Sequence, residues 1–283
     1  DLTKASSLLS LASKKLESGP LSVYLAEISK ALVTGSYYDS DVAWVKTTGI
    51  PFEFIFGPIE DYEDCLFGSK ASFEAYVGIP DNEATKNLEL FKNYIPEFDS
   101  ILAKRFNYAP KGSLAPMVVC NDVTRNGESG SALLFIATNL PNNREIHQKY
   151  GSKKVFSKSM IDEAEKNITS IAARRILSPK DFSYYKDDAS MLFTLGHEIA
   201  HGMGPGLIEV NGEKIVKEKI FKETDLPIEE AKADVLGFTF LRYLAGKGVL
   251  TGEQIKSAFV YDFVRNFLRY RTGFKKAHTI AAL

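Results

Sequence analysis

The sequence contains no long apolar run and no excess of charge of either sign. None of its hydrophobic stretches approaches the roughly 20 consecutive apolar residues that a transmembrane helix needs, so it gives no sign of a membrane span. It contains 35 basic and 36 acidic residues, which leaves a formal net charge of -1. This balance provides no general attraction to nucleic acid or to an anionic membrane surface. We therefore expect neither nucleic acid nor a membrane among the partners.

Cysteine is scarce as well, with only Cys65 and Cys120 in 283 residues. Two cysteines cannot build a disulfide framework, although a single bridge stays open; we expect reduced thiols and a cytoplasmic protein. The sequence has no signal peptide, but it begins with Asp1 rather than Met, so a leader or an upstream domain could have been removed. The apolar residues 277–283 end without a helix stop signal, which suggests a segment of a longer chain.

The apolar pattern predicts an α+β protein with a mixed first half and a helical second half. The chain is long enough for a large core, and 45% of its residues are apolar, as in ordinary globular proteins. Helical spacing of apolar residues predicts helices over 1–33, 82–106 and most residues after 157. Short β-branched runs predict strands over 43–57, 117–120 and 132–137, with turns at 121–130. Lys153 and Lys154 are interpreted as part of a solvated helix face.

The most specific motif is His197-Glu198-Ile199-Ala200-His201, which has the pattern HExxH. Residues four apart on a helix lie about 5–6 Å apart on one face, so both imidazoles can reach one zinc ion. Glu198 is the next residue around the helix and can contact a zinc-bound water without binding the metal. The chain has only four histidines, and two of them fall at this spacing around a glutamate, which makes a chance pairing a poor alternative.

A catalytic zinc ion normally has three protein ligands and one position for water. The segment 227–234, Pro-Ile-Glu-Glu-Ala-Lys-Ala-Asp, opens a second predicted helix and carries Glu230 and Asp234 four residues apart. One carboxylate can bind the metal while the other orients a histidine, and we predict Glu230 as the ligand. Acidic residues also favour the first turn of any helix, so this prediction depends on the neighbouring HExxH motif. With zinc bound, Glu198 would act as general base for the attacking water.

Five segments together resemble the dipeptidyl peptidase III family of zinc exopeptidases. They are HEIAHGMGPG at 197–206, IEEAKAD at 228–234, GPIEDYED at 57–64 followed by FGSKASFEAYV at 67–77, NLPN at 139–142, and KAHT at 276–279. The resemblance covers the chain from about Phe54 to its end. The HExxH segment is specific by itself, and the order of all five strengthens the resemblance.

The resemblance implies a role for individual residues. Glu60 would hold the free amino terminus of a peptide, and Tyr62 and His278 would act near the transition state. Asn139 and Asn142 would hydrogen-bond the bound peptide. Glu230 would bind zinc, with Glu229 behind a zinc-binding histidine.

The sequence departs from the family pattern at two places. The family's usual motif is HExxGH, one residue longer, although the shorter form occurs in a related branch with some members fused to a Nudix hydrolase domain. No Nudix box is visible here, and Ala282 stands where the family has an arginine after its C-terminal histidine. Both departures concern dipeptide preference and turnover more than zinc binding.

We therefore expect an α+β protein with two lobes around an active-site cleft. The mixed lobe would span 1–145, with a small β core and a helical excursion at about 82–108, and the helical zinc-binding lobe would span 146–283. The family's lobes are interleaved in sequence, so this boundary is an approximation.

The predicted function is a zinc-dependent metallopeptidase that releases dipeptides from the N-terminus of short peptides, with one Zn²⁺ per chain. The alternatives are a zinc endopeptidase or aminopeptidase, and a peptide-binding relative without catalysis. The natural peptide and the oligomeric state stay open at this stage.

Overall fold

The computed structural model describes residues 1–60, 72–110, 115–126, 136–205, 207–271, 273 and 277–282. Its contacts divide the chain into two compact units, residues 1–86 with 115–160 and residues 87–114 with 161–283. We call these the mixed unit and the helical unit. The expected single boundary at 145/146 differs from this division, because residues 153–157 pair with strands of the mixed unit and residues 95–106 pack in the helical unit.

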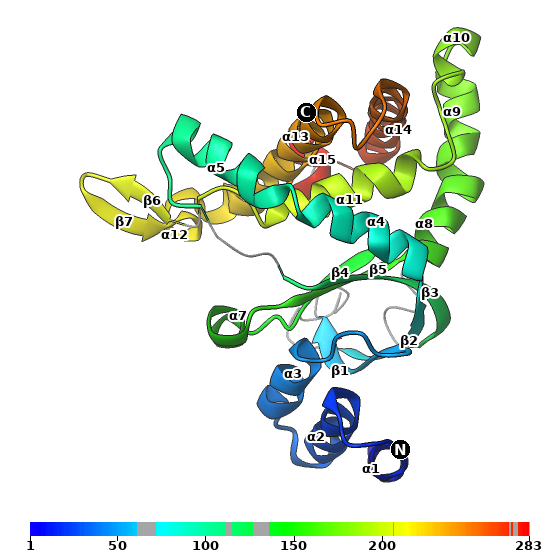
Figure 1. The fold of residues 1–283 in the computed structure, drawn as a ribbon, viewed down its shortest axis with the longest axis vertical. Helices are drawn as coiled ribbons and strands as arrows, with labels where there is room; N and C mark the ends of the chain where they lie inside the picture. The colour runs from blue at the N-terminus through cyan, green and yellow to red at the C-terminus, as the bar shows by residue number, and fades with distance from the viewer. Residues whose placement is uncertain are drawn as a thin grey trace. The chain divides into compact units, whose positions relative to one another are not determined.

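The mixed unit is built around a curled sheet (Figure 1). Among the described residues the sheet has five strands in the order β1-β2-β3-β5-β4. Their bounds are β1 Glu53–Glu60, β2 Ser72–Pro80, β3 Met117–Asn126, β4 Ala137–Leu140 and β5 Lys153–Ser157. The β3–β5 pair is parallel and the other pairs are antiparallel. This order places β1 and β4 at the two edges.

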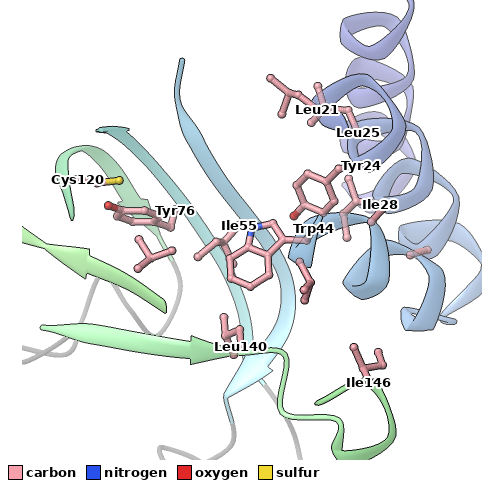
Figure 2. Packing of buried hydrophobic residues seen from close by; sticks show 14 residues of the cluster. Leu21, Tyr24, Leu25, Ile28, Trp44, Ile55, Tyr76, Cys120, Leu140 and Ile146 are labelled. Carbon is pink, nitrogen blue, oxygen red and sulfur yellow. The ribbon is translucent and has the colours of Figure 1, made fainter. Parts of the chain in front are cut away.

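The helices of the mixed unit are α1 Leu2–Lys15, α2 Pro20–Thr34, α3 Tyr38–Val45 and α7 Arg144–Tyr150, and α4 Asn82–Lys92 and α8 Lys158–Ala164 begin in it. Pro20 starts α2, and Gly35 ends it in the left-handed conformation that glycine adopts readily. Tyr24 from α2 and Trp44 from α3 pack toward Ile55 of β1 and Leu140 of β4 (Figure 2). This cluster is the core of the mixed unit.

The helical unit contains the pair of helices that carries the predicted metal-site residues. Its elements are α5 Ile95–Phe106, the π-helix η1 Glu165–Thr169, α9 Ser170–Ile176, α10 Pro179–Phe182, α11 Ala189–His201, β6 Leu207–Val210, β7 Glu213–Val216, α12 Lys217–Phe221, the 3-10 turn η2 Lys222–Thr224, α13 Asp225–Gly246, α14 Gly252–Tyr270 and α15 Ala277–Ala281. Phe98 of α5 packs on Phe240 of α13, with ring centroids 5.2 Å apart. Thr251 and Gln254 form a capping box that starts α14.

Three local predictions were wrong. Residues 43–45 end helix α3 instead of starting a strand, because Trp44 and Ala43 bury the same helix face as Ser40. Of the predicted turn segment 121–130, residues 121–126 are the second half of β3, and residues 127–130 lie outside the described part of the structure. Residues 207–216 form the hairpin β6–β7 rather than a helix, because Asn211 and Gly212 both take positive φ, as a two-residue hairpin turn requires.

Lys153 and Lys154 were also misassigned, because both lie on β5 and are only 2% and 5% exposed. The Lys153 ammonium donates to Glu53, with Nζ 2.9 Å from Oε1, and to the Thr47 carbonyl. A buried ammonium needs such partners to offset its desolvation. In the part of the chain that the structure describes, no helix is long and apolar enough to cross a membrane.

Candidate metal centre

Helix α11 carries the HExxH residues, as predicted. Leu192, Leu195 and Ile199 are buried and anchor one side of the helix. His197 is 5% exposed, and the helix ends at His201, with Gly202 as its C-cap. The two imidazoles therefore share one face, as the i and i+4 spacing requires.

A close crossing of α11 and α13 brings the second helix to this face. A Cβ atom on Gly237 of α13 would lie 2.9 Å from the backbone of Gly196 and His197. A Cβ atom on Gly196 would lie 3.1 Å from the Leu241 side chain. The two glycines therefore allow the helix backbones to touch next to His197.

The predicted ligand atoms of His197, His201 and Glu230 converge at this crossing. The two Nε2 atoms are 3.0 Å apart, and Glu230 Oε2 lies 3.3 Å from the Nε2 of His197 and 3.8 Å from that of His201. Two nitrogens bound to one tetrahedral zinc ion at 2.0–2.1 Å are about 3.3 Å apart. Glu230 Oε2 is buried and lies within 3.8 Å of ring nitrogens of His197, His201 and His278. The donor types and spacing thus fit a divalent ion such as zinc.

Each histidine of the motif is oriented by a carboxylate at its other ring nitrogen. His197 Nδ1 lies 2.7 Å from Asp234 Oδ1, and His201 Nδ1 lies 2.9 Å from Glu229 Oε1. Hydrogen bonds of this kind leave Nε2 of a neutral imidazole as the metal-binding atom. The structure therefore brings both predicted orienting residues, Glu229 and Asp234, to the site.

Basic residues that the sequence analysis did not single out hold these two carboxylates. The Glu229 carboxylate is contacted by Lys217 at 2.6 Å and Lys232 at 2.7 Å. The Asp234 carboxylate is contacted by guanidinium nitrogens at 3.0 and 3.1 Å, from Arg265 and Arg269 of α14. Sequence spacing gave a hint of these contacts. Lys232 follows Glu229 by three residues, and the two arginines are four residues apart, so each pair lies on one face of its helix.

The carboxylates of the site favour a positive charge between them, which a metal ion would supply in place of the proton on His197. Burial lowers the pKa of His197, but hydrogen bonds with Asp234 and Glu230 outweigh it and raise that pKa to about 9. Burial would raise the pKa of the Glu229, Glu230 and Asp234 carboxyls, yet their bonds to imidazoles hold each pKa well below its usual range. Charged carboxylates at neutral pH favour a cation among the ligand atoms.

Two further predicted residues lie at the same place. His278 of α15 places Nδ1 2.8 Å from Glu230 Oε2 and 3.3 Å from a guanidinium nitrogen of Arg269, and its side chain is half exposed. Possible ligand atoms of Glu198, His197 and His201 lie within 4.8 Å of one another, as do those of His197, Glu230 and His278. His278 therefore offers a further donor atom beside the predicted ligands.

The predicted peptide-binding residues belong to the mixed unit. Asn139 is exposed on edge strand β4, and Asn142 is exposed just after it. Glu60 is the last residue of β1, but its side chain lies outside the described part of the structure, and so does the whole of Tyr62. The structure leaves the predictions for Glu60 and Tyr62 untested.

Comparison with known proteins identifies the family of the chain. The profile of peptidase family M49 matches residues 5–241. The structure of DPP III from Caldithrix abyssi has 31% sequence identity and a TM-score of 0.89, covering 99% of this chain and 54% of that one. Dipeptidyl-peptidase III from Corallococcus sp. strain EGB has 28% identity and a TM-score of 0.80, covering 99% of this chain and 52% of that one.

Nudix hydrolase 3 of Arabidopsis thaliana is 31% identical over 279 residues, which are 98% of this chain and 36% of that protein. The chain thus spans about a third of this relative and about half of the two solved structures. It belongs to peptidase family M49. The predicted resemblance to dipeptidyl peptidase III and the two-lobed α+β fold are confirmed.

Proposed function

We propose that the protein is a zinc-dependent metallopeptidase that removes dipeptides from the N-terminus of short peptides. His197, His201 and Glu230 would hold the metal, and Glu198 would act as general base. The observation that carries this proposal is the convergence of two imidazole nitrogens and a buried carboxylate oxygen within 3.8 Å of one another. Membership of a peptidase family and the likeness to DPP III structures support it.

A metal ion held by these residues would supply the electrophile and an activated water. A zinc ion lowers the pKa of a bound water toward about 7 and polarises a carbonyl oxygen. Glu198 would serve as general base and accept the proton that a water loses on attacking the peptide carbonyl carbon. Glu198 follows His197 on α11, so its carboxylate stands beside the ligands without displacing one.

His278 and Tyr62 would stabilise the charge that develops on the carbonyl oxygen. The position of His278 next to Glu230 supports this role for the imidazole. Hydrogen-bond donors aimed at such an oxygen commonly contribute about 100-fold or more to the rate. The role of Tyr62 is carried over from the resemblance alone.

The peptide would be bound in extended form by the mixed unit. Strand β4 lies at the edge of the sheet, and β5 is its partner on the other side. Asn139 of β4 is exposed, so an added peptide strand would pass beside it. Asn142 would bind the peptide backbone, and Glu60 would pair with the free ammonium group and thereby select N-termini.

The test is mass spectrometry of an octapeptide incubated with the zinc-loaded protein, in free and N-acetylated forms. We expect loss of a dipeptide from the free form only, and at least about 100-fold slower cleavage by Glu198→Gln with zinc still bound. Internal cleavage of both forms would favour a zinc endopeptidase, and release of single residues would favour an aminopeptidase. Zinc binding without any cleavage would contradict the catalytic proposal and favour a peptide-binding relative.

A further inference from the structure

The mixed unit contains a pocket whose one described carboxylate takes no part in the proposed chemistry, although Asn142, one of the proposed peptide-binding residues, also lines it. Its volume is about 160 Å³, and it lies between α2, α3, β1 and the segment after β4. We call it the Asp41 pocket, after the one carboxylate among its described lining residues. A cavity of about 150 Å³ holds a ligand the size of benzene, so this pocket has room for roughly six heavy atoms.

Asp41 is a carboxylate without a cation. The structure gives its side chain no hydrogen-bond or ion-pair partner among the described residues, although it is only partly exposed. Burial raises the pKa of Asp41 to about 6, so the group is mainly ionised at neutral pH and its desolvation costs folding free energy. A carboxylate kept in such a place is typical of a binding site rather than of a fold-stabilising contact.

Aromatic side chains surround this charge. Tyr24, Tyr37, Trp44 and Phe56 line the pocket with Asp41. Tyr24 and Trp44 are nearly fully buried and project toward β1 (Figure 2). Aromatic rings attract organic cations through their negative faces, and rings combined with a carboxylate are a recurring way to bind ammonium groups.

Trp44 is held in place in the lining of the Asp41 pocket. Its Nε1 donates to Glu53 Oε1 at 2.8 Å, and the Lys153 ammonium lies 4.1 Å from the ring centroid. Lys153 is itself paired with Glu53 at 2.9 Å, so this cation is already neutralised by its own partner. The negative charge of Asp41 is left for a ligand.

We propose that the Asp41 pocket binds an alkylammonium group, with the carboxylate pairing with the nitrogen and the rings enclosing the carbons. The group could belong to a free amine or to the basic side chain of a peptide. Binding in the pocket depends on the mixed unit alone and does not require the metal or Glu198.

Trp44 provides the measurement, because it is the only tryptophan in the chain. Its fluorescence is titrated with n-butylamine at slightly alkaline pH, and with n-butanol and butyrate as neutral and anionic probes of similar size. We expect a saturable change with butylammonium and at least about tenfold weaker binding of the other two. Equal binding of butanol, or no saturable change with butylammonium, would overturn the proposal.

Variants separate the charge from the shape of the pocket. Asp41→Asn keeps the size of the side chain and should weaken butylammonium binding at least about tenfold. Asp39→Asn makes the same change on an exposed residue of the same helix and should bind like the parent. Circular dichroism checks that both variants are folded. Unchanged binding by folded Asp41→Asn would contradict the assignment.

The two sources of the ammonium group are distinguished by competition. The competitors are a short peptide that contains lysine and the same peptide with norleucine in its place. Each is added separately to the butylammonium complex of Glu198→Gln, a variant chosen because it should not cleave the peptides. Displacement by the lysine peptide alone would assign the pocket to basic side chains of peptides. Retention of butylammonium against both peptides would assign it to free amines. Cleavage of peptides by the parent protein is a separate readout, so failure here leaves the proposed peptidase function unaffected.

Discussion

Asp234 contacts His197 at the proposed metal centre and is expected to orient its imidazole. Its carboxylate accepts from His197 at 2.7 Å and is itself held by Arg265 and Arg269. Removing its charge would leave the imidazole free to rotate and to expose the wrong nitrogen to the metal. Orientation of this kind is worth about 10–100-fold in metal affinity.

Asp234→Asn should therefore weaken zinc binding by about 10–100-fold, measured by competition with a chromogenic chelator. Asp188→Asn is the matched control, because Asp188 caps the same helix as His197 without a side-chain cap hydrogen bond. The control should bind zinc like the parent. Equal affinities of all three proteins would show that Asp234 does not position His197.

At the level of single residues the sequence predicted much of the site, because local spacing on a helix determines which residues share a face. His197, His201, Glu230 and Asp234 could be singled out for that reason, whereas Glu229 was singled out only through the resemblance to the dipeptidyl peptidase III family. Lys217, Arg265 and Arg269 could not, because they reach the carboxylates from other elements. The burial of Lys153 was missed for the same reason, since its partner Glu53 is far away in sequence.

The crossing of α11 and α13 depends on glycine at two positions. Ala at 237 would gain roughly 1 kcal/mol of helix propensity. However, its Cβ would lie 2.9 Å from backbone atoms of α11, which cannot swing away as a side chain can. Overpacking of this kind costs about 1–3 kcal/mol, so the steric cost should exceed the gain in helix propensity.

Gly237→Ala is expected to lower the free energy of unfolding by about 1–2 kcal/mol and to weaken zinc binding, because the helices must separate at His197. Gly246→Ala, at the exposed end of the same helix, adds a Cβ that meets nothing within 4 Å. That control should be neutral or more stable by up to about 1 kcal/mol. Urea unfolding measures both. Equal stability of the two variants would argue against a tight crossing.

Elements whose apolar residues recur at a clear helical spacing were predictable from the sequence. Elements determined by turn chemistry or by packing were not. The apolar stripe of Leu192, Leu195 and Ile199 identified α11. The hairpin β6–β7 was missed although Asn211-Gly212 is a strong local turn signal, because the surrounding residues were interpreted with the helical second half. Residues 43–45 were assigned to a strand because β-branched and aromatic residues suit both states in a short segment.

Metal loading should stabilise the whole chain, because zinc binds the folded site and not the separated ligands of the unfolded chain. At a free zinc concentration 100 times the Kd, the gain is about 2.7 kcal/mol. Chelation followed by dialysis should lower Tm, and added zinc should restore it. The effect should be much smaller in Glu230→Gln, which loses a ligand. A Tm that zinc raises equally in this variant would contradict the role of Glu230.

The assignment of elements to the two units was the feature hardest to predict from the sequence. Apolar periodicity identifies α5, but it does not tell which partner its buried face meets. Phe98 packs against Phe240 and Tyr243, more than 140 residues later, so α5 belongs to the helical unit. The expected domain boundary at 145/146 separates these partners.

This interleaving has a consequence for how the protein is made. When a ribosome has released residues 1–160, every segment of the mixed unit has emerged, whereas α5 still lacks Phe240 and Tyr243. The apolar side of α5 must wait for the last third of the chain to be synthesised. A gene fragment that begins after residue 114 would encode the proposed zinc ligands but not the helix that packs on α13. Such a fragment would expose that face of α13 and would be a poor starting point for producing the metal centre in isolation.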